Sequence, residues 1–195
     1  MQVIETEIKI RLVDCELFEQ SLCGLGFTQE TTRTFERNTL YDTADRKLRQ
    51  SRQILRVRDY GGKWTVTHKT VPEDDDPSDR HKRRIETETV VEDGRALSKI
   101  FESLGLEPVF VYEKWRTEWT DGTGHCVIDE TPLGPYAEIE GPGDWIDSTA
   151  RKMQLKESEF IKLSYGRLFE AWREQSKSKA QNLSFSEIPP GSRAS

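Results

Sequence analysis

The chain has 195 residues, of which 35 are acidic and 29 basic, so its formal net charge is −6. This balance argues against general nucleic-acid binding, which needs a basic surface. No apolar run approaches the ~20 residues that a membrane helix requires, so we expect no membrane span. The N-terminus shows no secretory signal pattern, and the three cysteines form neither a CxxC pair nor an even set. We therefore expect a cytoplasmic protein.

A weak internal repeat organises the first hundred residues. Residues 5–26 and 86–105 each begin with Glu-Thr-Glu, continue through an acidic residue into a helical apolar pattern, and end at a Leu-Gly pair. An acidic residue at the start of a helix and a glycine at its end are typical capping residues. The repeat predicts a strand, a helix and further strands in each half, as duplicated architecture rather than as two domains.

Polar segments interrupt this pattern at two places. Residues 71–80 contain an acidic stretch flanked by prolines, which we interpret as a solvated loop rather than as a metal site. Residues 176–195 are small, polar and broken by Pro and Gly, so we expect a disordered tail with no catalytic role and a folded domain over residues 1–175. Apolar residues at helical spacing predict a further helix from about Glu157 to Glu174.

Charged side chains alternate with apolar ones along the predicted strands, so each strand has one charged face. In the first strand Glu5, Glu7 and Lys9 share a face, while Ile8 and Ile10 take the other. The predicted helices need an apolar sheet face to cover, which leaves the charged faces on the opposite side. A closed antiparallel barrel with a charged interior satisfies both demands and has no free edges. The same alternation places these further residues inside: Arg56, Arg58, Lys69, Arg84, Glu86, Glu88, Lys114, Arg116, Glu118, Asp129, Glu138 and Glu140.

So many interior charges constrain the ligand, because a buried ion is costly unless it has a partner. Mutual ion pairs can serve some of them. A strongly anionic ligand held by Arg and Lys, with divalent cations at the carboxylates, would serve the rest. A polyphosphate with Mg²⁺ or Mn²⁺ fits both halves of this demand, whereas a sugar, a lipid or a neutral metabolite fits neither.

These residues resemble the CYTH domain, or triphosphate tunnel metalloenzyme, family. The family's N-terminal hallmark Glu-x-Glu-x-Lys is found at Glu5-Thr6-Glu7-Ile8-Lys9, and Ser164-Tyr165 matches the branch that includes class IV adenylate cyclases. The resemblance covers roughly residues 1–172. The intervening elements follow in order: Leu40-Tyr41-Asp42-Thr43, Leu55-Arg56-Val57-Arg58, Thr67-His68-Lys69, Arg84-Ile85-Glu86-Thr87-Glu88, Lys114-Trp115-Arg116, Ile128-Asp129 and Glu138-Ile139-Glu140.

The resemblance implies an α+β fold in which a closed eight-stranded antiparallel barrel forms a tunnel, with helices packed on its outside. It implies divalent-metal-dependent chemistry on triphosphates, with Glu5, Glu7 and Lys9 as catalytic residues. The metal ligands implied are Glu5, Glu7, Glu88, Asp129, Glu138 and Glu140. The residues implied to bind the triphosphate are Lys9, Arg56, Arg58, Lys69, Arg84, Lys114 and Arg116.

Several alternatives stay open at this point. The reaction could be cyclisation of ATP to cyclic AMP and pyrophosphate, or hydrolysis of tripolyphosphate or thiamine triphosphate, with either Mg²⁺ or Mn²⁺. A non-catalytic module that captures polyphosphate, nucleotides or phosphorylated RNA is a second alternative, although it gives the glutamates no use. A barrel with internal ion pairs and an external partner surface is a third. We expect a small-molecule triphosphate partner and neither membrane nor nucleic acid, and a homodimer is one option for the assembly.

Overall fold

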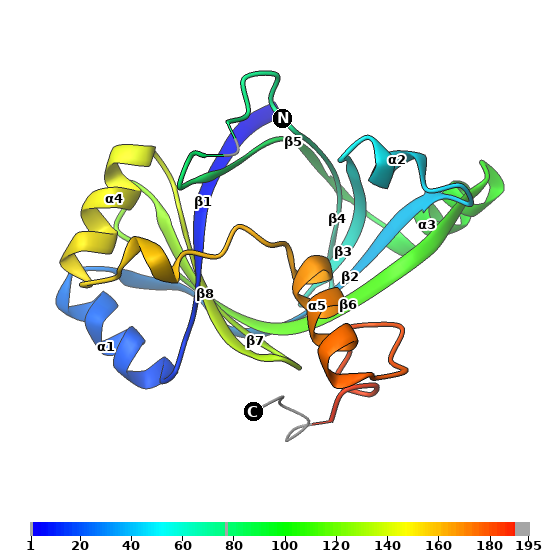
Figure 1. The fold of residues 1–195 in the computed structure, drawn as a ribbon. Coiled ribbons are helices and arrows are strands. Elements are labelled where there is room, and N and C mark those ends of the chain that lie inside the picture. The colour runs from blue at the N-terminus through cyan, green and yellow to red at the C-terminus, as the bar shows by residue number, and fades with distance from the viewer. Residues whose placement is uncertain (1, 77, 190–195) are drawn as a thin grey trace.

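Eight antiparallel strands close into a barrel in the computed structural model, which describes residues 2–76 and 78–189 (Figure 1). Their order around the barrel is β1-β5-β4-β3-β2-β6-β7-β8, and β1 closes it by pairing with both β5 and β8. The predicted fold class is thereby confirmed. The strands are β1 (Gln2–Arg11), β2 (Thr28–Thr43), β3 (Ile54–Tyr60), β4 (Lys63–Thr70), β5 (Lys82–Val91), β6 (Leu106–Thr120), β7 (His125–Thr131) and β8 (Gly134–Glu140).

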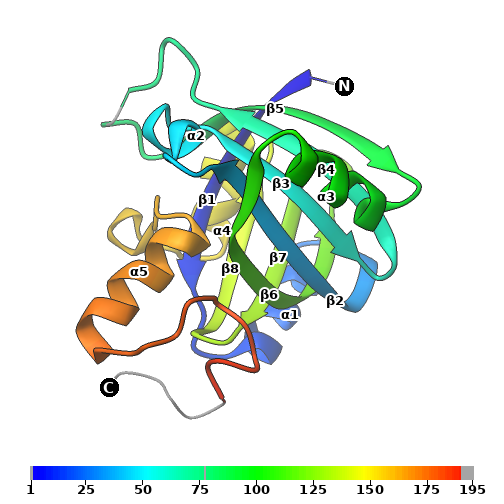
Figure 2. The ribbon, with the colours of Figure 1, turned by 90° about the vertical axis from the view of Figure 1, so that its right-hand side faces the viewer.

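Helices pack on the outside of the barrel, as the apolar strand faces require. Helices α1 (Cys15–Gly24) and α4 (Gly143–Lys152) cover the side formed by β1, β7 and β8, and α3 (Gly94–Ser103) lies on the other side (Figures 1 and 2). The main core joins Leu22 of α1 and Ile146 of α4 to the outward-facing Ile8 and Ile139. The sequence analysis did not predict α4, whose few apolar residues include the buried Ile146 and Ala150.

The internal repeat is visible in the two helices that follow β1 and β5. Asp14 accepts a hydrogen bond from the Leu17 amide at the start of α1, and Asp93 accepts from two amides at the start of α3. Gly26 and Gly105 end the two units with φ of 87° and 85°, a conformation that glycine adopts without strain. The capping residues predicted for the start and the end of each repeated helix are thus observed.

The prediction of a helix over residues 157–174 is wrong for the first half of this range. A 3₁₀ turn covers Glu157–Glu159, an extended connector follows, and α5 runs over Tyr165–Ser176. The connector is extended because the Ile161 amide donates to the Lys9 carbonyl oxygen of β1 at 2.7 Å. The Lys9 ammonium group also donates to the carbonyl oxygen of Leu163 at 3.0 Å. Strand β1 therefore holds this segment across one mouth of the barrel.

The predicted disordered tail is ordered over its described part. Leu183 lies beside β6, donating to the Val111 carbonyl oxygen at 3.0 Å while its own carbonyl accepts from the Glu113 amide at 2.9 Å. Leu183 and Ile188 are buried in a second core cluster with Phe169 of α5. Three separated apolar residues, with Ala180 the first, thus anchor a segment whose composition suggested disorder. The folded unit extends through residue 189, and residues 190–195 lie outside the described part.

The acidic loop is tied down by surface ion pairs. Arg52 contacts Asp75 at 2.9 Å, and Arg83 contacts Asp74 at 3.2 Å; Pro77 is outside the described residues. Within residues 2–76 and 78–189, no group of three or more His, Cys, Asp or Glu side chains is already arranged to hold a metal. No helix in the same ranges is both long and apolar enough to cross a membrane.

Candidate functional site

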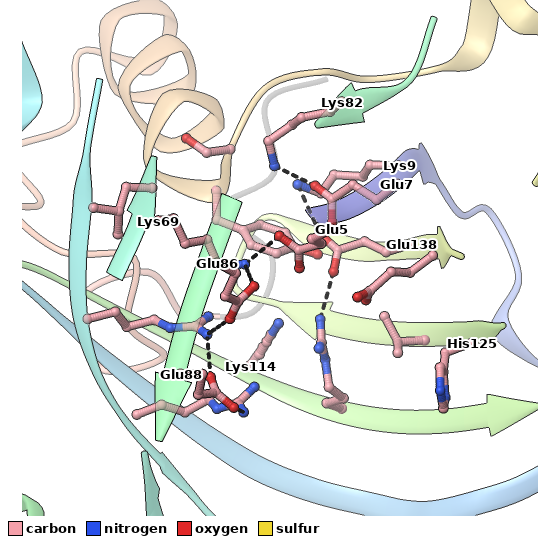
Figure 3. Close-up of a pocket in the computed structure, with 18 of the residues that line it drawn as sticks. Glu5, Glu7, Lys9, Lys69, Lys82, Glu86, Glu88, Lys114, His125 and Glu138 are labelled. Atoms are coloured by element: carbon pink, nitrogen blue, oxygen red, sulfur yellow. Dashed lines mark hydrogen bonds and ion pairs between the residues drawn. The ribbon is translucent and has the colours of Figure 1, made fainter. Parts of the chain in front are cut away.

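The barrel encloses a cavity of about 580 Å³ whose walls are dominated by charged side chains (Figure 3). We call this cavity the tunnel. Residues at alternate strand positions point into it, as the sequence pattern predicted, because successive side chains face opposite sides of a strand. Two of the predicted site residues do not line it: Asp129 is buried behind its wall, and Arg84 lies in a neighbouring pocket. The predicted residues that line it are Glu5, Glu7, Lys9, Arg56, Arg58, Lys69, Glu88, Lys114, Arg116, Glu138 and Glu140.

Asp129 on β7 is the fully buried hub of a network that we call the Asp129 centre: Asp129, Lys114, Arg116 and Tyr165. Its Oδ1 accepts from Arg116 Nε at 2.7 Å, and its Oδ2 accepts from Lys114 at 2.8 Å, from Arg116 Nη2 at 2.7 Å and from the Tyr165 hydroxyl at 2.7 Å. Four charge-assisted bonds engage the carboxylate, one at Oδ1 and three at Oδ2. The carboxylate therefore fixes two cations against the tunnel rather than presenting a free oxygen to it.

Glu36 of β2 supports the same cations, and the sequence analysis did not identify it. Its carboxylate is fully buried and lies 3.4 Å from the Lys114 ammonium group. Burial by itself raises the pKa of this carboxyl, but Lys114 and Arg116 outweigh burial and lower the pKa to about 2. The sequence contains no clear signal for Glu36, because Arg37 and Thr39 follow it on the outward positions of β2 and the charged–apolar alternation is lost there.

Three carboxylates, Glu5, Glu7 and Glu140, gather where β1 pairs with β8; we call them the seam carboxylates. Glu7 stands directly opposite Glu140 in the strand register. Glu5 is paired with Lys69 at 2.6 Å, and Glu7 is paired with Lys82, a residue that the sequence analysis overlooked although it shares the inward face of β5 (Figure 3). Lys82 balances Glu7, whereas Lys69 is shared between Glu5 and Glu86, which it contacts at 2.8 Å.

Glu140 is the seam carboxylate without such a partner: no ion pair joins it to any residue in the described part of the chain. Burial, followed by repulsion from Glu5 and Glu7, raises the pKa of Glu140 to about 8. The neighbouring Glu138 shows the opposite behaviour, because it contacts Lys9 at 3.2 Å and Arg116 at 2.7 Å. Burial raises the pKa of Glu138, but Lys9 and Arg116 outweigh burial and hold it well below its usual range. The seam thus holds more carboxyl groups than its own cations keep ionised.

The opposite wall of the tunnel is a second set of paired charges. Glu88 of β5 contacts Arg58 at 3.1 Å and accepts from the Thr67 hydroxyl at 2.5 Å. Arg56 donates to Thr67 at 3.1 Å and to the Tyr112 hydroxyl at 3.3 Å. The guanidinium groups are thereby oriented by short contacts before any ligand arrives.

Comparison with known proteins places this geometry in a family. The model of the CYTH domain matches residues 3–159. The chain belongs to the CYTH domain family. A Methanocaldococcus jannaschii protein provisionally named an adenylate cyclase is 32% identical over 139 residues, which is 71% of this chain and 77% of that protein.

Solved structures share the fold of this CYTH domain. A Vibrio parahaemolyticus protein provisionally described as an adenylate cyclase matches with a TM-score of 0.74 and 20% identity, over 86% of this chain and 98% of its own. The PH1012 protein of Pyrococcus horikoshii matches with a TM-score of 0.71 and 23% identity, over 84% and 98%. A Hippeastrum protein described as having a dominant triphosphatase activity matches with a TM-score of 0.60 and 17% identity, over 86% and 95%.

Proposed function

We propose that this CYTH domain is a divalent-metal-dependent enzyme that binds a triphosphate in the tunnel and either hydrolyses it or, when it is ATP, cyclises it to cyclic AMP and pyrophosphate. The observation that carries the proposal is the division of the tunnel walls. Seven Lys and Arg side chains line the cavity, several of them oriented by buried carboxylates, while three of its eight glutamates gather at the β1–β8 seam with two lysines against them. A triphosphate needs the cationic side chains, and a divalent cation needs the carboxylates.

The cations would hold the phosphoryl oxygens. Lys114 and Arg116 are fixed by Asp129, while Arg56 and Arg58 are fixed on the opposite wall by Thr67 and Glu88. Such preorganised donors stabilise charge that develops during phosphoryl transfer without reorganising at the moment of reaction. Lys9, 3.2 Å from Glu138 and 4.1 Å from the centre of the Tyr165 ring, would position phosphate next to the seam.

The seam carboxylates fit a hard divalent cation such as Mg²⁺ or Mn²⁺. Carboxylate oxygens are the donors that both prefer, and the raised pKa of Glu140 records repulsion that a cation would relieve. We propose Glu5, Glu7 and Glu140 as the residues that hold it, with Lys69 and Lys82 balancing two of these charges in its absence. When bound, the cation would offset phosphoryl charge and lower the pKa of a coordinated water. Glu88, Asp129 and Glu138, which the resemblance also implied as ligands, are occupied by cationic side chains in this arrangement.

A product assay tests the proposal. Purified protein would be incubated with Mg²⁺ or Mn²⁺ and either ATP or tripolyphosphate. Cyclic AMP with pyrophosphate would establish a cyclase, whereas orthophosphate without cyclic AMP, released fastest from tripolyphosphate, would establish a triphosphatase. Tight binding of either compound with no product under any condition would contradict catalysis and favour a binding module.

A further inference from the structure

Tyr165, the first residue of α5, lies in the tunnel wall although it comes after residues 3–159, where the CYTH model matches. Its side chain is buried. The hydroxyl donates to Asp129 Oδ2 at 2.7 Å, which accounts for the polar end of the side chain. The aromatic ring makes separate contacts, and these concern the cations of the tunnel.

Two ammonium groups lie against this ring. The centre of the ring is 4.1 Å from Lys9 Nζ and 5.1 Å from Lys114 Nζ. Both distances are within the roughly 6 Å over which the face of an aromatic ring attracts a cation. Lys9 is 2% exposed and Lys114 is 3% exposed, and this attraction is strongest where water is excluded. One ring therefore contacts cations that enter the tunnel from two different strands, β1 and β6 (Figure 3).

An aromatic ring holds a cation differently from a carboxylate. Lys9 also contacts Glu138 at 3.2 Å, and Lys114 also contacts Asp129 at 2.8 Å. A carboxylate orients a cation but offsets its charge, whereas a neutral ring orients the cation and leaves its charge available to an anion. Burial, followed by the charge of Asp129, raises the pKa of the Tyr165 hydroxyl well above its usual range, so the ring stays neutral. Tyr165 thus adds orientation without removing positive charge from the tunnel.

Helix α5 is anchored to three other parts of the molecule, so the position of the ring is fixed. The extended connector before α5 is hydrogen-bonded to β1 (Figure 1). Arg49 of α2 (Lys47–Gln50) pairs with Glu170 of α5 at 2.7 Å. Phe169 of α5 belongs to the same buried cluster as Leu183 of the C-terminal segment. A fixed ring restricts two long lysine side chains before a ligand arrives, so less conformational entropy is lost when an anion binds.

We propose that Tyr165 is a positioning residue that holds the Lys9 and Lys114 ammonium groups in the orientation that binds the triphosphate. This inference rests on the proposed function, because it requires an anion in the tunnel. It assigns the positioning to the face of the ring rather than to the hydroxyl. Removal of the ring should therefore weaken binding more than removal of the hydroxyl alone.

Calorimetry of tripolyphosphate binding, in buffer without divalent metal so that no turnover occurs, tests this inference. Tyr165→Phe keeps the ring, and Tyr165→Leu removes it. We expect Tyr165→Phe to bind within about threefold of the wild type and Tyr165→Leu to bind about tenfold more weakly, because only the second loses both cation–π contacts. The matched control is Phe27→Leu, which removes a buried ring that packs against Trp145 in the main core and does not line the tunnel. This control should bind as the wild type does.

A second series keeps the shape of the side chain nearly constant, so it remains decisive even if Tyr165→Leu does not fold. Phenylalanine analogues with one, two and three ring fluorines at position 165 withdraw electron density from the face of the ring. The affinity for tripolyphosphate should fall stepwise as fluorines are added, because the attraction of a cation depends on the negative face of the ring. Thermal unfolding without ligand would verify that each protein is folded.

Two results would overturn the inference. Equal affinity of the fluorinated and unfluorinated proteins would show that the ring only fills space. An equal loss of affinity in Tyr165→Leu and Phe27→Leu would reduce the effect to a loosened fold. Failure of the wild type to bind tripolyphosphate would contradict the proposed function itself, whereas wild-type binding that does not respond to fluorination would contradict only this inference.

Discussion

The Asp129 centre and the seam carboxylates are built from the same kinds of residue on neighbouring strands, yet they differ in how their charge is balanced. Asp129 accepts from Lys114, Arg116 and Tyr165 and is completely buried. Glu140, two strand positions beyond Glu138 on β8, faces Glu5 and Glu7, and its pKa is raised to about 8 by burial and then by those two carboxylates. Neighbouring cations balance the charge of Asp129, whereas no cation pairs with Glu140 in the described part of the chain.

The contrast distinguishes a carboxylate that orients other side chains from carboxylates that can bind a ligand. A buried carboxylate whose two oxygens are both bonded keeps its cations in one orientation, and removing it leaves those buried cations with fewer carboxylate partners. A buried carboxylate beside two others is unfavourable when ionised, and an added cation would stabilise its ionised form. The resemblance assigned both kinds to metal binding, whereas their surroundings favour metal binding for the seam and orientation of Lys114 and Arg116 for Asp129.

The largest expected effect is at the Asp129 centre. Asp129→Asn would remove the carboxylate that Lys114 and Arg116 share and would leave them only Glu36 and Glu138, so we expect the free energy of unfolding to fall by about 3 kcal/mol, the low end of the usual cost of breaking a buried ion pair. Urea denaturation would measure it. Asp74→Asn, which breaks only the exposed pair with Arg83, is the control and should leave the midpoint unchanged. Equal stability of the two variants would show that Asp129 does not contribute to the stability of the fold.

On the seam, the expected effect is on turnover rather than on folding. Glu140→Gln keeps the shape of the side chain and removes its charge, so we expect Mg²⁺-dependent product formation to drop on the order of 10²-fold or more. Because the substitution also removes repulsion from Glu5 and Glu7, the unfolding free energy should not fall. Glu102→Gln on α3 is the matched control. Full Mg²⁺-dependent activity in Glu140→Gln would rule out the seam as the metal site.

A smaller effect, on pH dependence, follows from the raised pKa of Glu140. The folded protein retains a proton on this carboxyl up to about pH 8, whereas the ordinary value is 4.5. The corresponding stability is fully present below about pH 4.5 and is lost as the pH rises through about 8. In metal-free buffer the melting temperature of the wild type should therefore fall across this range relative to Glu140→Gln. Parallel melting curves for the two proteins across the range would contradict the shared burial of the seam carboxylates.

The sequence alone determined the barrel and most of its inner surface. Charged residues at every second position of β1 and β6 identify which side chains point inward, because the period of a strand is two whatever surrounds it. The same period extended back to the start of β5 would have added Lys82, whereas the mixed charges of β2 hide Glu36. Local capping signals at Asp14 and Asp93 likewise defined the two repeated helices without any tertiary information.

Only the tertiary structure decided which of those inward charges are paired. Asp129 and Glu140 look alike in sequence, but their pKa values and roles depend on residues from distant segments, such as Tyr165 of α5 and Glu5 of β1. The ordered segment around Leu183 has the same origin, since it forms where residues far apart in the chain meet. Strand periodicity is a local property, whereas the balance of buried charge is set by every neighbour within a few ångströms.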